Sequence, residues 1–123
     1  MLNVKALLTK ILTKLDAHNT NYIIDEGVTG SWRYRKWQNG VCELWQRKGV
    51  SRNGNNTKIE FTFPWAFTYA PIITVSAGAT GNINAYAAYT GSTTTGCEVY
   101  VNASSGSQVW ASVYAIEVLG GGN

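Results

Sequence analysis

The chain is short of the residues on which most catalytic and metal sites depend. Its 123 residues include one histidine, two cysteines, two prolines and one methionine. Metal-ligand spacing of His, Cys and acidic residues is absent, and Ser-His-Asp chemistry would have to recruit the lone His18. No stretch approaches the roughly 20 apolar residues of a membrane span, and no secretory signal peptide is visible. We therefore expect no enzymatic activity, no catalytic residue, no cofactor, no metal and no membrane insertion.

Cysteine is too scarce to build a disulfide framework. Cys42 and Cys97 both fall inside segments that read as strands. One pair of cysteines in a chain of this size is not the pattern of a disulfide-stapled domain. We expect both thiols to be reduced and partly buried, behaving as small hydrophobic side chains.

Charge is also scarce and is unevenly distributed. Only 14% of the residues are charged, against about a quarter in a typical protein. All ten cations lie at or before Lys58, giving that part a net charge of +6, whereas residues 59–123 carry three glutamates and a net charge of −3. The basic residues are dispersed, in runs no longer than two, which argues against nucleic acid. Attraction to an acidic cell-wall polymer, or plain solubility, explains them better.

The N-terminal segment, residues 2–18, has the pattern of an amphipathic helix. Its apolar stripe follows the alternating three-and-four spacing of a coiled coil, and Leu7 and Leu12 widen it. Two heptads are too short to be stable alone in water. The helix must pack on its own domain or on copies of itself, and we favour self-association through the residues Val4, Leu8, Ile11, Leu15 and His18. His18 is either an ordinary helix-terminal cation or one member of a ring around a symmetry axis that captures a metal or an anion.

The remainder predicts an all-β fold, an antiparallel β-sandwich. Short alternating segments separated by turn-forming residues are typical of sandwiches. We expect a connector over 19–30, the sandwich over 31–119 and a flexible tail over 120–123. Strands are expected over residues 58–63, 72–77, 82–89, 97–101 and 109–119, with a loop over 48–56. The last strand is apolar on both faces, so we expect a neighbouring subunit to cover one of them, at Trp110 and Tyr114.

The segment 32–45 predicts a β-hairpin turning at Asn39-Gly40. Asn-Gly between two aromatic-rich runs favours a two-residue type I′ loop. Such a loop places Lys36 opposite Glu43 and Tyr34 opposite Trp45, so that both faces combine aromatic rings with cationic tips.

The same hairpin carries a family resemblance. The pattern Trp-x-Tyr-Arg-Lys-Trp-x-Asn-Gly-x-x-Glu-x-Trp, followed by Phe63-Pro64, Phe67, Pro71 with the run 72–75, and the closing strand 109–119, resembles the C-terminal head domains of phage tail-fibre and receptor-binding proteins. These heads are similar to the H-type lectin sandwich. The resemblance implies a homotrimer led in by a stalk. It also implies a place at the tail tip of a virion, after synthesis in the host cytoplasm.

The aromatic content indicates binding. Five Trp and seven Tyr exceed the needs of one small core, and sugars stack on such rings while amides and arginines supply hydrogen bonds. Trp37, Trp45 and Trp110 are assigned to packing. The candidate ligand-binding residues are Asn82, Asn84, Tyr86, Tyr89, Trp65, Tyr69, Arg47 and Arg52.

Three functions follow in order of preference. The first is a homotrimeric tail-fibre head that binds a bacterial surface polysaccharide or teichoic acid. The second is a purely structural trimerising cap or connector of a tail or baseplate. The third is an enzyme acting on polysaccharide, although the carboxylates of Glu43, Glu60, Glu98 and Glu117 fall on separate expected strands.

Overall fold

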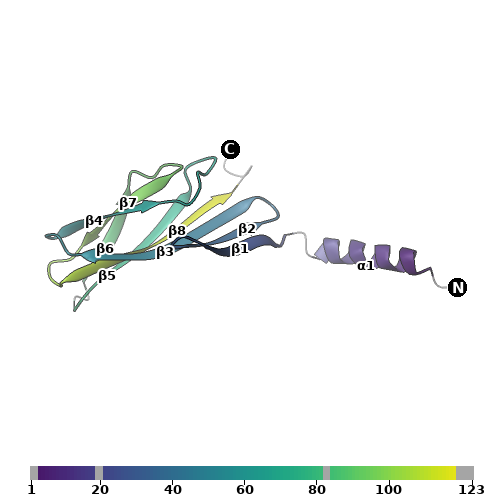
Figure 1. Ribbon diagram of the computed structural model, residues 1–123, viewed down its shortest axis with the longest axis horizontal. Coiled ribbons are helices and arrows are strands. Elements are labelled where there is room, and N and C mark those ends of the chain that lie inside the picture. The colour runs from purple at the N-terminus through teal and green to yellow at the C-terminus, as the bar shows by residue number, and fades with distance from the viewer. Residues whose placement is uncertain (1–2, 19–20, 82–83, 119–123) are drawn as a thin grey trace.

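Two antiparallel sheets pack face to face, preceded by one helix (Figure 1). The computed structural model describes residues 3–18, 21–81 and 84–118, with side chains of 14–18 and 118 outside the description. Helix α1 spans Val4–His18, and the strands are β1 Ile23–Thr29, β2 Trp32–Trp37, β3 Val41–Ser51, β4 Asn56–Thr62, β5 Ile72–Ala79, β6 Tyr86–Thr90, β7 Gly96–Asn102 and β8 Gln108–Val118. The large sheet has the order β1-β2-β3-β8-β5 and the small sheet β4-β7-β6. The expected antiparallel sandwich with a short N-terminal helix is confirmed.

Helix α1 starts two residues later than predicted because Asn3 caps it. The Asn3 side-chain oxygen accepts hydrogen bonds from the backbone N–H groups of Lys5 and Ala6, at 3.1 and 3.3 Å, and so satisfies N–H groups that lack a partner within the helix. Figure 1 shows α1 standing clear of the sandwich. Its apolar side chains Val4, Leu7, Leu8, Ile11 and Leu12 are 41–72% exposed.

The core lies between the sheets and follows the predicted alternation. Strands β7 and β8 bury every second residue, and β4 buries Ile59 and Phe61 in the same way. Trp32 joins the two layers, since its indole N–H donates to the Thr62 carbonyl at 2.8 Å and its ring meets the rings of Phe61 and Phe63 edge-on. The packed interior therefore fixes which face of each sheet points outward.

Both cysteines are free, as predicted, with Cys42 half-buried and Cys97 buried. Burial raises the pKa of Cys97 to about 11. A thiol with that pKa stays protonated at neutral pH and is a packing group rather than a nucleophile.

The hairpin forms where predicted, but the predicted register differs from the observed one by one residue. Lys36 pairs with Cys42 and Tyr34 with Leu44, instead of with Glu43 and Trp45. The loop has three residues. The Gly40 N–H donates to the Trp37 carbonyl, and Gly40 alone takes a positive φ, of 95°. This is a type I turn closed by a glycine bulge. A shift of one residue moves a strand's side chains to opposite faces.

Two segments that were expected to be a connector and a loop form strands instead. Residues 23–29, expected within a connector, form β1, which pairs with β2 from Ile23 to Thr29. Strand β3 continues through Ser51 into the segment expected as a loop, because β8 pairs with it over its whole length, from Val41 to Ser51. In both cases the partner strand supplies the hydrogen bonds that the local sequence does not specify.

Candidate functional site

The outward side of the large sheet carries aromatic rings that no other part of the described chain covers. The register directs Trp37, Glu43, Trp45, Trp110 and Tyr114 to this side, and we call it the aromatic face. All five side chains are half-buried. At the two sheet edges, Val28 of β1 and Ile72 of β5 are 61% and 68% exposed. An apolar surface that runs from edge to edge of a sheet is typical of an interaction surface.

Polar groups within the aromatic face satisfy one another. One carboxylate oxygen of Glu43 accepts from the Trp37 indole N–H at 2.5 Å, and the other accepts from the Tyr114 hydroxyl. The predicted Lys36–Glu43 pair is wrong, because the register sends these two side chains to opposite faces. A carboxylate with both oxygens bonded costs less free energy to remove from water than a bare one.

Two cations on this face lie over rings. The Arg35 guanidinium is 5.3 Å from the Trp45 ring centroid, and its Nε is 3.5 Å from Glu26 Oε2, an ion pair without hydrogen-bond geometry. The Arg47 guanidinium is 4.9 Å from the Trp110 ring. That indole covers Gly78, where an added Cβ would lie 2.4 Å from the ring. Stacked in this way, arginine presents a flat edge rather than an isolated charge.

The Tyr114–Glu43 contact predicts alkaline sensitivity. Burial, then the hydrogen bond to Glu43 and the charge of Glu43, raise the pKa of Tyr114 from 10.0 to about 12. The unfolded chain loses this proton at lower pH than the folded chain, so the contribution to stability is complete below about pH 10 and is lost as the pH rises through 12. Tyrosinate absorbance, assigned with Tyr114→Phe, should titrate earlier in Glu43→Gln than in the unchanged protein. Superimposable titrations would contradict the assigned contact.

Beside these rings lies a shallow groove of about 240 Å³ between β3, β8 and β5. Its lining combines aromatic, hydroxyl and guanidinium groups from Trp45, Arg47, Thr74, Ser76, Ser112 and Tyr114. Such a lining suits polar contacts with another chain or with a hydroxyl-rich ligand.

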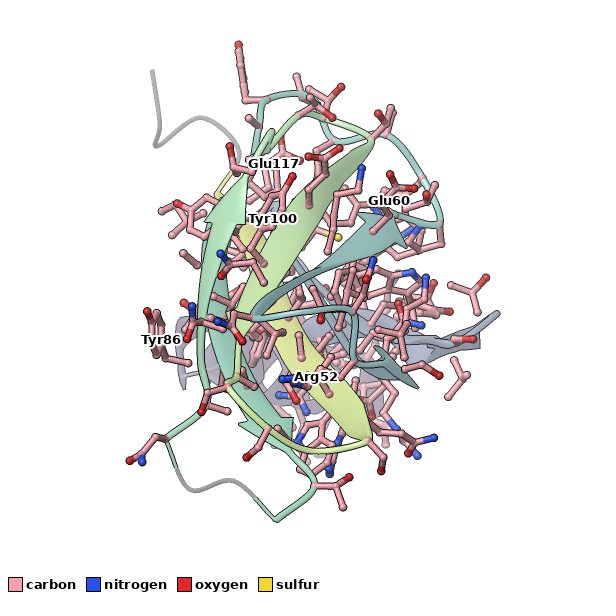
Figure 2. All side chains as sticks on the ribbon, turned by 90° about the vertical axis from the view of Figure 1, so that its left-hand side faces the viewer. Arg52, Glu60, Tyr86, Tyr100 and Glu117 are labelled. Atoms are coloured by element: carbon pink, nitrogen blue, oxygen red, sulfur yellow. The ribbon has the colours of Figure 1, made fainter. Side chains whose placement is uncertain are left out.

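The outward side of the small sheet is different in character. Strand pairing places Tyr86, Asn102 and Asn56 side by side across β6, β7 and β4, and the next row holds Tyr100 and Lys58. Asn102 Nδ2 donates to Asn56 Oδ1 at 2.9 Å. Figure 2 shows Tyr86 projecting away from the sheet. This surface offers amides and phenols rather than indoles.

An ion-pair cluster continues that surface. Lys58 Nζ lies 3.2 Å from Glu60 and 3.8 Å from Glu98. The hydrogen bond to Glu60, then the charge of Glu98, raise the pKa of Lys58. Glu60 and Lys58 of β4 thus form a salt bridge. As the pair is exposed, it adds little to stability.

The structure separates the candidate ligand-binding residues predicted from the sequence. Asn84 lies in the turn before β6 and Tyr86 is the first residue of that strand, whereas Tyr89 lies further along it on its opposite face. Arg47 belongs to the aromatic face. Arg52 is turned inward onto carbonyls of the β7–β8 connection. Asn82 lies outside the described residues.

Trp65 and Tyr69 lie in the connection between β4 and β5, beside Tyr34 of β2 and Glu117 of β8. Trp65 packs edge-on against Tyr34, with the Lys36 ammonium 4.4 Å from its ring. The backbone N–H of Tyr69 donates to Glu117 at 2.8 Å, while the Tyr69 side chain is exposed. Trp65 is therefore part of the packing, and only Tyr69 offers a free ring here.

The residues predicted as a subunit interface fall on two surfaces. Trp110 and Tyr114 lie on the aromatic face, and Val4, Leu8 and Ile11 are exposed on α1. The side chains of Leu15 and His18 lie outside the described part. The sequence reading missed Glu43 as the centre of a ring cluster, because the wrong register assigned it to Lys36. It also passed over Tyr100 and Asn102, which the alternation of β7 directs outward.

The described residues provide neither a metal centre nor a membrane segment. Over 3–18, 21–81 and 84–118, no three His, Cys, Asp or Glu side chains gather as metal ligands would. In that same part of the chain, no helix has the length and apolar character that crossing a membrane requires.

Solved structures similar to this one are pyocin fibres. No family model and no curated protein matches the chain. The C-terminal part of the R1 pyocin fibre of P. aeruginosa matches 76% of this chain at 19% identity with a TM-score of 0.60, over 28% of its own length. An N-truncated R1-type pyocin tail fibre matches 95% of this chain and 98% of its own at 16% identity, with a TM-score of 0.61. An R2-type fibre matches 79% of this chain and 37% of its own, at 18% identity and a TM-score of 0.55.

Proposed function

We propose that this chain is the head domain of a phage or phage-like tail fibre, and that it binds a bacterial surface glycan as a homotrimer. The observation that carries the proposal is the shared fold with a pyocin tail fibre over 95% of this chain and 98% of the other. Fold alone does not determine function, so the uncovered surfaces of this chain supply the rest of the argument. The location that follows is the tail of a virion.

Self-association is supported by two apolar surfaces that nothing in the described chain covers. One is the stripe on α1 and the other is the aromatic face. A 15-residue helix is marginal alone in water, so α1 needs partners. Its stripe is widened by Leu7 and Leu12, which favours more than two helices around an axis.

The aromatic face suits a protein partner because several of its charged groups already have contacts within the face. Glu43 has both oxygens bonded, and Arg35 and Arg47 are stacked on rings. A carboxylate that is already bonded in this way costs less free energy to bury in an interface than a bare one. In the proposed trimer, Trp110 and Tyr114 contact the next subunit.

Glycan binding is supported by exposed phenols and amides, the groups that stack on sugar rings and bond to their hydroxyls. Single sites of this kind are weak. Three linked heads raise the apparent affinity through effective concentration, without new contacts. The proposed head is lectin-like because it would bind sugars through stacking rings and hydrogen-bonding amides at several linked sites.

The proposal is tested by binding of the full chain to immobilised bacterial surface glycans. The trimer should bind at least about 100-fold more tightly than a variant made monomeric at α1, since avidity is lost with the linkage. A trimer that binds no glycan would favour the structural cap or connector. Release of soluble sugar during the assay, abolished by acid-to-amide changes, would instead indicate an enzyme.

A further inference from the structure

Three loops meet at the end of the sandwich opposite α1, as Figure 1 shows. They are the β3–β4 connection (residues 52–55), the β5–β6 connection (described at 80–81 and 84–85) and the β7–β8 connection (103–107). We call this end the tip. If α1 joins three heads, the tip is the part of each head farthest from the junction.

Arg52 ties two of these loops together. Its Nε donates to the Ala103 carbonyl at 3.1 Å and its Nη2 to the Ser104 carbonyl at 2.7 Å. The backbone N–H of Arg52 donates to the Ser107 carbonyl at 3.0 Å. Figure 2, which faces this end, shows Arg52 in the middle of the molecule rather than at its rim.

Gly106 brings in the third loop. It has a φ of +108°, and an added Cβ would lie 2.6 Å from the Thr80 carbonyl oxygen. The Thr80 N–H donates to the Gln108 carbonyl at 3.0 Å. These contacts hold the β3–β4 connection, the β7–β8 connection and Thr80 to one another. Groups that are already held in place lose less conformational entropy on binding.

The described part of the tip has almost no charge. Over residues 51–56, 80–81, 84–86 and 102–108, the side chains are amides, hydroxyls, small groups and one phenol, and Arg52 is the only ionisable cation. Arg52 already donates to two carbonyls. Arg47 is stacked on Trp110 of the aromatic face, and Lys58 is paired with Glu60. A polyanion would find no cluster of free positive charge at this end.

Tyr86 gives the tip a stacking surface. Its side chain is 62% exposed at the start of β6, and its strand partner is Asn102, which is bonded to Asn56. The bond between the two amides orients both, and each keeps further donor and acceptor capacity for a ligand. A ring beside oriented amides is the arrangement that holds a sugar face and its hydroxyls.

We propose that the tip binds an uncharged saccharide, with Tyr86 stacking on a sugar ring and Asn56 and Asn102 bonding its hydroxyls. This rests on the proposed function and narrows it, since it selects a neutral polysaccharide over an anionic polymer such as teichoic acid. It also selects Tyr86 over Tyr69 among the exposed tyrosines predicted to bind.

The test compares binding of the full chain to two sets of immobilised oligosaccharides. One set is built of neutral hexoses and N-acetylhexosamines, and the other carries uronic acid or phosphate. We expect binding to the neutral set, unchanged between low and high salt because no ion pair forms. Tyr86→Ala should lower the affinity at least about tenfold, whereas Tyr86→Phe, which keeps the ring, should stay near the unchanged protein.

Tyr69→Ala is the matched control, because it removes another exposed tyrosine, 53% against 62%, that lies beside the far end of β8, and it should leave binding unchanged. Neutral-glycan binding that survives Tyr86→Ala, or a preference for the anionic set that salt weakens, would overturn the inference and leave the proposed function standing. A confirmed trimer that binds neither set would overturn both. Light scattering on each variant confirms that the assembly is intact.

Discussion

Replacing Leu8 and Ile11 of α1 with aspartate is expected to convert the proposed homotrimer into a monomer. The mass in solution should fall from three times 13.4 kDa, about 40 kDa, to that of one chain. Both side chains are about half exposed and lie on one side of the helix, where they contact nothing in the described sandwich. Charges placed in a helix–helix seam would have to be buried without partners, which disfavours association.

The measurement is native mass by light scattering. Ala6→Asp/Thr13→Asp is the matched control, because it adds the same two charges to the side of α1 away from the stripe and should leave the trimer intact. If the unchanged protein were already a monomer, the stalk, the avidity and the covered aromatic face would all be contradicted. If the Leu8→Asp/Ile11→Asp protein were still a trimer, the subunits would have to contact one another through the sandwich alone.

Leu44→Ala is expected to be among the most destabilising substitutions in the sandwich. Leu44 is completely buried, and it lies in β3 between Tyr34 of β2 and Ala115 of β8. Truncating such a side chain removes apolar burial and leaves a cavity, which together cost about 2–5 kcal/mol. For a domain of this size that is a large part of its total stability.

Denaturant unfolding measures the effect, in the Leu8→Asp/Ile11→Asp background so that association does not contribute. Ile72→Ala is the control, since it shortens an aliphatic side chain that is 68% exposed and should change the free energy of unfolding little. Trp45→Ala serves as a second comparison, because its side chain is on the outward face next to Leu44. A larger loss for Trp45→Ala than for Leu44→Ala would contradict the observed hairpin register.

Much of the fold was predictable because the alternation of residues along a strand reflects which side chains are buried in the core. The segment 97–101 alternates strictly, and the structure buries Cys97, Val99 and Val101. Strand β8 likewise buries every second residue. The same pattern identified the last strand as apolar on both faces, and β8 does lie inside the large sheet, between β3 and β5, with Trp110 and Tyr114 on its uncovered side.

The hairpin shows where a local signal fails. Asn39-Gly40 favours a two-residue turn, but Asn39 keeps a negative φ and Gly40 alone takes the positive one. The longer loop lets Trp32 and Leu44 both enter the core. Burial of two large side chains outweighs the preference of one dipeptide, and the register follows the core.

The candidate surfaces were less predictable because they are assembled from segments far apart in sequence. Arg52 was expected to meet a ligand, and its neighbours in the chain give no sign that it bonds carbonyls more than 50 positions away. Tyr86 was recognised, but its amide neighbours Asn56 and Asn102 meet only because β4, β7 and β6 lie side by side.

The sequence by itself determined the class of the protein: an amphipathic helix, an antiparallel sandwich, free cysteines and an aromatic-rich surface short of charge. These follow from composition and from periods of two and of three to four residues, which act within single elements. Only the tertiary structure decided the hairpin register, the strand at residues 23–29, the partners of Glu43 and the joining of three loops at the tip. Those depend on strand order and on which side chains fill the shared core, and both are set by contacts between distant segments.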